Sequence, residues 1–311
     1  MQKITYSLLG VILLVMLSCK VINTSNIESD VPLKLENSLL WKIEGNGLSK
    51  PSYLFGTIHL IKADKYFLPS GFRKAFDESK SVVFEIDIDK MNDISEQMKF
   101  LPKLMMKGDT SLKDLITDDE YSKVQKYFNE KHLPLFLFEK IKPMFLTMFT
   151  DGDFNPNSIQ SGEYVSYEME ISKLAKENGK NINGLETIDF QISVLDSIPY
   201  AYQAEMLMKS IEVQGGDTNQ TDDMYDMYLE QNITDLHQSI ESEDISKYDK
   251  ILLNNRNNTW IPRMSDYMQQ GQTFFAVGAG HLAGNQGVIE LLRKKGYKVI
   301  AVLDERKNIK K

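Results

Sequence analysis

Short apolar segments with β-strand character gather toward the two ends of this chain, and helical patterns lie between them. Near the start, residues 38–47 and 52–60 are separated by a polar turn, and 81–89 alternates apolar with acidic positions, which is the period of a strand. Near the end, 273–277 and 297–303 flank a glycine turn and a helical segment, which predicts a parallel pair with a crossover. We therefore expect an α/β fold, with a single sheet built from N- and C-terminal strands and a large helical insertion.

The middle of the chain is expected to be mainly helical. Helical patterns cover residues 69–80, 91–149, 163–178, 187–212 and 224–269. A short strand is expected at 181–185, and polar breaks are expected at 151–158 and 214–223. We expect one domain over 38–303, followed by a basic tail over 304–311.

The balance of charge argues against a general nucleic-acid binder. The chain carries 36 lysines and arginines against 44 acidic residues, a formal net charge of −8, whereas phosphate contacts need clustered basic side chains. Gly278-Ala279-Gly280 precedes a helical segment but lacks the spaced third glycine of a dinucleotide site. We expect neither a nucleic acid nor a nucleotide as a partner.

The first 19 residues have the pattern of a secretory signal. The apolar run over 8–17 has ten residues, too few to cross about 30 Å of hydrocarbon as a helix. It stops at Leu17-Ser18-Cys19, which contains the only cysteine of the chain. This ending resembles a bacterial lipoprotein signal, in which the cysteine becomes the lipidated first residue. The alternative is a plain signal peptide with an incidental cysteine.

We therefore expect a signal peptide over 1–18, a lipid on Cys19 and a polar tether over 19–37. Nothing else in the chain could pair with Cys19 in a disulfide, which suits lipidation. These features predict a lipid-anchored protein of the bacterial cell envelope. Lys20, which follows the cysteine, favours the outer membrane.

Two of the four histidines share a local setting. His59 and His281 each end a Gly-x-x-His motif that closes or follows an expected strand. Strand ends in open α/β sheets are common ligand sites, glycine lets the backbone approach a ligand closely, and imidazole nitrogen binds transition metals. The alternative is that both histidines merely finish strands and meet water. His132 and His237 are expected to be solvated or to cap helices.

Glu85 is the third candidate. It lies in Val82-Val83-Phe84-Glu85-Ile86-Asp87, where apolar neighbours indicate partial burial. A buried carboxylate is costly unless it is paired or bound to a metal. The alternative is the polar face of a half-exposed strand, because Glu85 alternates with Asp87 and Asp89.

Five motifs, in order and spacing, together resemble the TraB/GumN (TraB/PrgY/GumN, TIKI-related) family. They are LFGTIHL at 54–60, VVFEID at 82–87, NGLETIDFQ at 183–191, Arg256-Asn257, and FFAVGAGHLAGNQGVIELLRKKGYKV at 274–299. The resemblance covers about residues 38–303. Position 168 is Glu where many relatives carry Asp, which leaves the role of Glu168 open.

The resemblance implies a metal-dependent protease. In similar animal proteins, activity depends on the paired Gly-x-x-His motifs and an acidic residue, which map onto His59, His281 and Glu85. A divalent ion held there, whether Mn, Co or Zn, would lower the pKa of a bound water toward neutrality. Whether Glu85 is a ligand or the general base stays open.

Two further residues are candidates for catalysis. Arg256 could stabilise a developing oxyanion, and its alternative is a surface cation on a helix. Glu186 follows the short strand and could orient a ligand histidine or act as a proton shuttle. Its alternative is a carboxylate that is favoured by the dipole at a helix start.

The function expected from these observations is a metal-dependent hydrolase of the cell envelope. A peptidase is favoured, with a peptide or protein as substrate. The alternative is a non-catalytic envelope lipoprotein of the same fold that binds peptides or acts as a scaffold.

Overall fold

The computed structural model describes residues 34–91, 94–150, 161–215, 219–241, 248 and 250–305. The expected signal peptide, Cys19 and most of the expected tether lie outside these residues, as do the expected break at 151–158 and the end of the expected basic tail. None of the helices in the described ranges has the length and apolar character needed to cross a membrane.

The described chain divides into two compact units. The first, here called the sheet unit, comprises the described parts of 21–88, 165–188 and 223–311. The second, the helical unit, comprises the described parts of 89–164 and 189–222. Each unit is described in turn.

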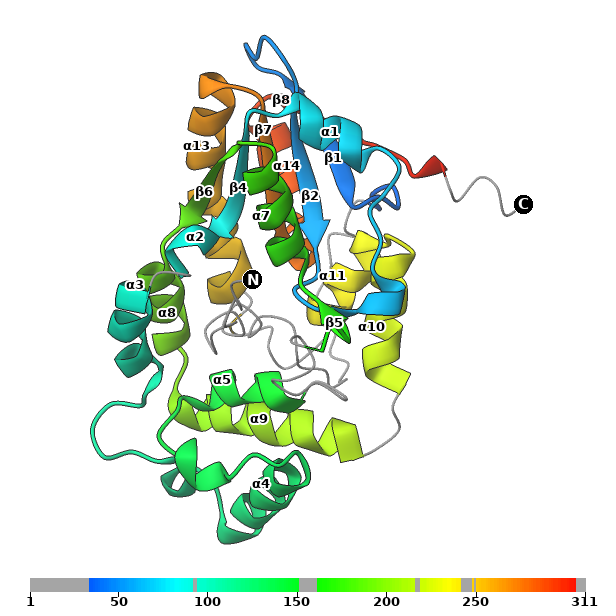
Figure 1. Ribbon diagram of the computed structural model, residues 1–311. Helices are drawn as coiled ribbons and strands as arrows, with labels where there is room; N and C mark the ends of the chain where they lie inside the picture. Colours follow the sequence, from blue (N-terminus) through cyan, green and yellow to red (C-terminus); the bar gives the residue numbers. More distant parts are fainter. Residues whose placement is uncertain are drawn as a thin grey trace. The chain divides into compact units, whose positions relative to one another are not determined.

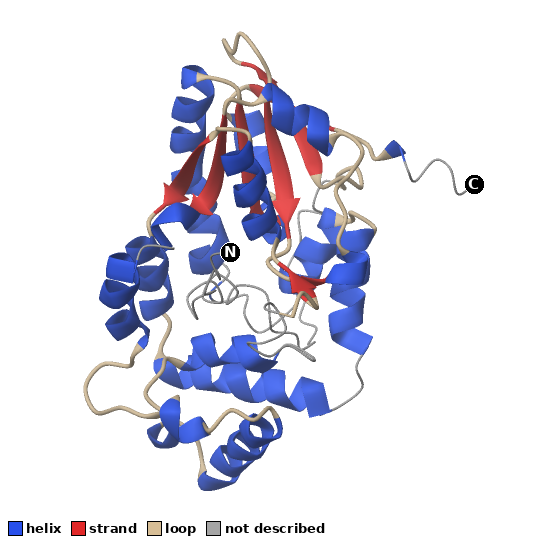
Figure 2. Cartoon of the chain, viewed as in Figure 1, coloured by secondary structure: helices blue, strands red, loops and turns tan. Residues whose placement is uncertain are grey.

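The sheet unit is built on one six-stranded sheet of order β6-β4-β7-β2-β1-β8 (Figures 1 and 2). Its strands are β1 (Leu40–Gly45), β2 (Ser52–Thr57), β4 (Ser81–Ile86), β6 (Asn181–Glu186), β7 (Thr273–Gly278) and β8 (Tyr297–Ala301). β6, β4, β7 and β2 pair in parallel, whereas β1 is antiparallel to both of its neighbours. This arrangement confirms the predicted α/β class with a single main sheet.

The pairing of the last two strands differs from the expected one. β7 lies between β4 and β2, and β8 pairs with β1 at the edge of the sheet. A crossover does connect them, but β2 and β1 lie between them. The sequence pattern missed this because β2 and β7 are buried at every position, as central strands are, and apolar runs of this kind do not specify neighbours.

Helices cover both faces of the sheet. In Figure 1, α1 (Phe72–Glu78) and α7 (Tyr167–Glu177) lie in front of the strands, and α13 (Asn255–Gln270) and α14 (Val288–Lys294) lie behind them. Aromatic side chains fill the front layer: the Phe72 ring meets those of Phe55 and Phe274 edge-on, with centroids 5.2 and 5.1 Å apart. Such pairs add to the energy of apolar burial.

Shorter elements complete the arrangement. They are β3 (Ile61–Lys62), η2 (Ala63–Lys65), α2 (Ile88–Met91), β5 (Tyr164–Val165), α10 (Asn219–Leu229), α11 (Ile233–Glu241), the π-helical turn η7 (Lys250–Asn254) and the 3₁₀ turn η8 (Ala279–His281). The expected break at 214–223 is shorter than predicted, because α10 already begins at Asn219.

The helical unit confirms the expected helices but divides them into short pieces. They are α3 (Ile94–Phe100), η3 (Leu101–Leu104), η4 (Leu112–Asp114), α4 (Asp118–Glu130), η5 (Leu135–Leu137), α5 (Pro143–Leu146), η6 (Thr147–Thr150), α8 (Ile188–Asp196) and α9 (Tyr200–Gly215). Prolines lie at the second position of η3 (Pro102), immediately before η5 (Pro134) and at the first position of α5 (Pro143). Proline suits the first turn of a helix and interrupts a continuing one.

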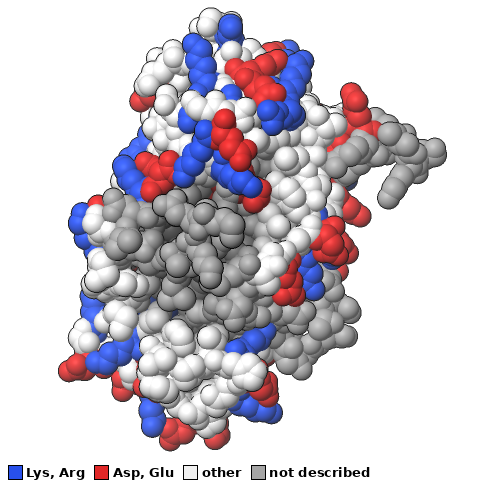
Figure 3. Space-filling model, in the orientation of Figure 1, with Lys and Arg blue, Asp and Glu red and all other residues white. Residues whose placement is uncertain are grey.

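The exposed charges are mixed in sign. On the face drawn in Figure 3, lysine and arginine lie among aspartate and glutamate over the described residues. Exposed pairs such as Arg73–Asp77, whose side chains are 60% and 50% exposed, contribute little to stability because water screens them. The charged groups that can matter most are therefore the buried ones.

Alanine substitution at Gly284, with Gly179 as the reference, tests how tightly the loop after β7 is packed. Gly284 has φ +84°, and a Cβ there would lie 2.1 Å from Nε2 of buried His237, whereas Gly179 has φ +63° with open space around it. We expect Gly179→Ala to lower the free energy of unfolding by about 1–2 kcal/mol, and Gly284→Ala to lower it by about 1–3 kcal/mol more because of overpacking. Urea unfolding measures both. Equal losses would mean that His237 moves aside freely.

Candidate functional site

The C-terminal ends of the four parallel strands meet at one edge of the sheet. Thr57 of β2 is level with Gly278 of β7, and Ile86 of β4 is level with Glu186 of β6. This register brings His59, Glu85, Glu186 and the turn that carries His281 to the same edge, which is where open α/β sheets commonly bind ligands. Every one of these residues belongs to the sheet unit.

Burial decides between the alternatives that the sequence left open. Glu85 is 7% exposed, so it does not lie on a half-exposed face, and Arg256 is 0% exposed, so it is not a surface cation. His59 and His281 are also buried rather than ending their strands in water. Buried groups of this kind must be paired, so their partners define the site.

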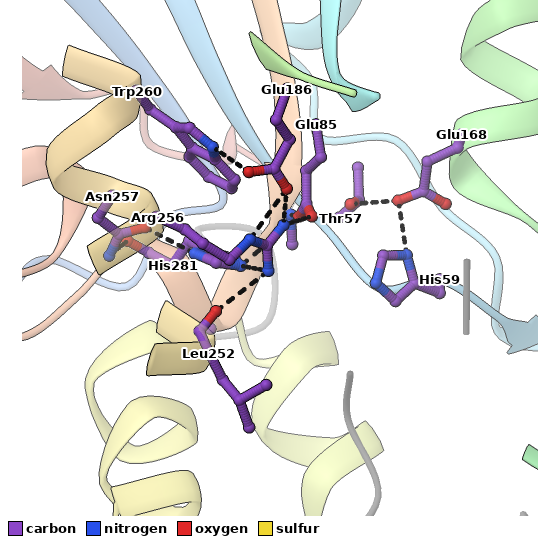
Figure 4. Close-up of polar contacts among 12 residues, drawn as sticks. Thr57, His59, Glu85, Glu168, Glu186, Leu252, Arg256, Asn257, Trp260 and His281 are labelled. Carbon is purple, nitrogen blue, oxygen red and sulfur yellow. Dashed lines mark hydrogen bonds and ion pairs between the residues drawn. The ribbon is translucent and has the colours of Figure 1, made fainter. Parts of the chain in front are cut away.

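Arg256 lies at the centre of the buried polar network (Figure 4). Its Nε donates to Glu186 Oε1 at 2.9 Å, and its Nη2 donates to Glu85 Oε2 at 2.6 Å and also to Glu186 Oε1. Its Nη1 donates to the Leu252 carbonyl at 3.1 Å and faces His281 Nε2 at 3.3 Å. All five N–H groups of the guanidinium thus have partners, so an oxyanion could bind Arg256 only by replacing one of them.

The network keeps Glu85 ionised. Burial raises the pKa of Glu85, but the Arg256 guanidinium and the two histidines outweigh burial, and the pKa falls to about 2. Burial likewise opposes the charge of Arg256, but Glu85 and Glu186 outweigh it and raise the pKa of Arg256. Glu186 also accepts a hydrogen bond from Trp260 Nε1 at 2.9 Å. Glu186 therefore anchors α13 at the sheet edge, and these contacts do not test its proposed role as a proton shuttle.

The tautomer of His281 follows from its neighbours. The Asn257 amide Nδ2 donates to the carbonyls of Gln286 and His281 at 2.9 and 3.4 Å, so its Oδ1 is the atom that faces His281 Nδ1 at 2.6 Å. That oxygen can only accept, so Nδ1 carries the proton and Nε2 carries the lone pair. Burial, followed by the nearby Arg256 cation, lowers the pKa of His281 to about 3 despite the Glu85 carboxylate, and the ring is neutral at pH 7.

His59 has a different partner. Its Nδ1 lies 3.1 Å from Glu168 Oε1, and the Thr57 hydroxyl donates to the same oxygen at 2.6 Å. Burial lowers the pKa of His59, but the Glu168 carboxylate outweighs burial, and the pKa is raised. Sequence reasoning assigned no role to Glu168. The available signal was the resemblance, in which many relatives carry the other acidic residue, Asp, at position 168, and this does not identify His59 as the partner.

The structure brings the predicted residues to one edge without arranging them as a metal cluster. His281 Nε2 lies 3.7 Å from Glu85 Oε1. Within the described parts of the chain, no group of three or more His, Cys, Asp or Glu side chains is placed to hold a metal ion. The physical reason is Arg256, whose guanidinium lies against both Glu85 and His281.

The donor set nevertheless fits a divalent ion in its chemistry. Each histidine has Nδ1 directed at an oxygen acceptor, which is the usual orientation of imidazoles that bind a metal through Nε2. His281 Nε2 faces Arg256 Nη1 at 3.3 Å, so an ion would have to replace that contact. Glu85 supplies a carboxylate, and two carboxylates face a single guanidinium at this edge, so negative charge is in excess. Two imidazoles and a carboxylate suit Mn, Co or Zn.

The other two histidines have different outcomes. His132 is exposed near the C-terminal end of α4, as expected. The expectation of a solvated or capping His237 was wrong: this residue is 4% exposed, and its Nδ1 lies 3.3 Å from the Gly280 carbonyl. The reason is that α11 packs His237 against the turn that carries His281. A largely polar helix sequence does not indicate such a tertiary contact.

The acid sensitivity of the fold tests the burial of His281. Its pKa is about 3 in the folded chain, against an ordinary 6.5, so the unfolded chain takes up the proton first and stability falls as the pH drops from 6.5 toward 3. The pKa of His59 is raised in the folded chain, so protonation of His59 increases stability as the pH drops. We therefore expect His281→Gln to lose less stability than the wild type between pH 6.5 and 4.5, by up to about 1.4 kcal/mol per pH unit. Urea unfolding across this range measures it, and identical slopes would contradict a buried neutral His281.

Comparison with known proteins identifies the family of the chain. It is similar to Metalloprotease TIKI2 of Danio rerio (23% identity, covering 89% of this chain and 63% of that protein), to a Metalloprotease TIKI homolog of Nematostella vectensis (26%, 90% and 70%) and to Metalloprotease TIKI1 of Homo sapiens (22%, 89% and 64%). The chain thus spans less than two thirds of the length of TIKI2. No solved structure matches it. The family model described as TraB/PrgY/gumN matches residues 39–301, and the chain belongs to the TraB/PrgY/gumN family.

Proposed function

We propose that this chain is a metal-dependent hydrolase that cleaves peptide bonds. The observation that carries the proposal is the meeting of both Gly-x-x-His histidines and Glu85 at the C-terminal edge of the parallel strands. Relatives that share most of the described chain carry the name metalloprotease, which supports the same reaction class.

The residues of the site have distinct parts in this proposal. His59, His281 and Glu85 would hold the divalent ion, which when bound supplies Lewis acidity and a water of lowered pKa. Asn257 holds the His281 ring with Nε2 as the lone-pair atom. Arg256 keeps Glu85 ionised and orients Oε2, while the Gly278 backbone N–H orients Oε1 at 2.8 Å.

The main proposal is tested by peptide turnover. The chain is stripped of metal with a chelator, supplied with Mn²⁺, Co²⁺ or Zn²⁺, and given a peptide library whose products are identified by mass spectrometry. We expect metal-dependent cleavage that falls by at least about 100-fold in His59→Ala and Glu85→Gln, the size of effect seen for groups acting at the reacting atoms. His132→Asn is the matched control, because His132 is exposed and has φ +58°, which asparagine tolerates.

Two outcomes would overturn this proposal. Unchanged turnover in both site variants would exclude this edge of the sheet as the active site. A folded chain that cleaves no peptide with any of the three ions, but binds peptides from the library, would instead be a non-catalytic binding protein.

We also propose that the enzyme acts in the bacterial cell envelope, held by a lipid on Cys19, with the outer membrane as its location. The support is the sequence pattern of residues 1–19. Cells that express the chain and are fed a labelled fatty acid should label the wild type and not Cys19→Ser. Equal labelling of both would refute the anchor, and it would leave the proposed chemistry untouched.

A further inference from the structure

We propose that Glu168 is a positioning residue that fixes the tautomer and the orientation of His59, so that Nε2 is the lone-pair nitrogen of the ring. The part of this inference that concerns metal affinity rests on the proposed function. The part that concerns the tautomer stands on the contacts of His59 alone.

The Glu168 carboxylate is itself held in place. It lies in the first turn of α7, where Ser166 caps the helix by accepting from the Met169 N–H at 3.4 Å. The Ser166 hydroxyl also faces Glu168 Oε2 at 3.3 Å, and the side chain is 4% exposed. A helix N-terminus favours negative charge, so the position suits a fixed anionic acceptor.

The carboxylate determines which ring nitrogen carries the proton. An ionised carboxylate has no hydrogen to donate, so the His59 Nδ1 that faces Oε1 at 3.1 Å must be the donor. The Thr57 hydroxyl also donates to this oxygen, at 2.6 Å. Its proton is therefore directed at Glu168 and not at His59 Nδ1. In the neutral ring, the lone pair is then on Nε2.

In the second Gly-x-x-His motif, an unrelated residue also accepts a hydrogen bond from Nδ1 of the histidine. Asn257 of α13 accepts from His281 Nδ1–H, and Glu168 of α7 accepts from His59 Nδ1–H (Figure 4). Two helices on opposite faces of the sheet therefore impose one tautomer on both rings. A buried acid that served only the packing of α7 would have no reason to repeat the arrangement found at His281.

The experiment compares Glu168→Met with Glu168→Asp and with Glu170→Gln, which changes an exposed glutamate in the same helix turn. Methionine keeps the length of the side chain but has no carboxylate to accept from His59 Nδ1, so it removes the contact that holds the ring in the Nδ1–H form. The ¹⁵N spectra of ring-labelled histidine in the metal-free chain, at about pH 9 where the ordinary imidazole is neutral, report the tautomer. The His59 signals are assigned with His59→Gln.

We expect Nδ1–H in the wild type, in Glu168→Asp and in Glu170→Gln, and a shift toward Nε2–H in Glu168→Met. The dissociation constant for Mn²⁺, measured by calorimetry, should be about 10–100-fold larger in Glu168→Met, as for other partners that orient a ligand, and unchanged in Glu170→Gln. Glu168→Asp should restore much of the affinity.

The outcomes separate this inference from the proposed function. A wild type that binds Mn²⁺, with tautomer and affinity unchanged in Glu168→Met, would overturn the inference and leave the proposed function standing. A wild type that binds no Mn²⁺, while Glu168→Met shows the tautomer shift, would support the inference and contradict the proposed metal binding. If Glu168→Met does not fold, the wild-type spectrum decides, since Nε2–H at His59 would by itself refute the inference.

Discussion

The site is organised around one buried cation. The Arg256 guanidinium, on α13, joins Glu85 of β4 to Glu186 of the neighbouring β6 and also faces His281 beyond β7. Burying a cation is costly unless its charge and its hydrogen bonds are fully met. Here both are met, so this network selects the packing of α13 on the sheet edge. Loss of one partner would leave an unpaired buried charge, which typically costs about 3–5 kcal/mol.

The same network places a constraint on the proposed chemistry. Glu85 Oε2 already accepts a hydrogen bond from Arg256, and its Oε1 accepts from the Gly278 backbone N–H. A divalent ion would therefore share Glu85 with Arg256 rather than find it unengaged. Glu186 relieves this competition, because it offers the guanidinium a second carboxylate. The pairing of two carboxylates with one guanidinium thus leaves negative charge in excess at this buried sheet edge, which favours an additional cation.

The strands and the principal site residues could be predicted from the sequence because their signals are local. Apolar runs mark β2 and β7, and the histidines follow a few residues later, so the rule that parallel strands end together brings His59 and His281 to one edge. The contacts of these residues could not be predicted, although the resemblance singled out Arg256-Asn257. Arg256 and Asn257 lie in NRNNTWIPRMSDYMQQ, a helix so polar that its spacing does not show which side chains face the core. His237 was missed for the same reason, and the position of β8 depends on the free edge of β1.

The paired motifs also show how far a short pattern determines chemistry. Both histidines follow a glycine by three residues, both are buried and both donate from Nδ1, yet their pKa values shift in opposite directions. Burial lowers the pKa of both rings. At His59 the Glu168 carboxylate outweighs burial, whereas at His281 burial and the Arg256 cation beside Nε2 together outweigh the Glu85 carboxylate. The motif therefore places each imidazole at the same buried edge, and the charged groups around each ring decide whether burial is outweighed. Two helices with no sequence resemblance thus make one repeated motif into two chemically different groups.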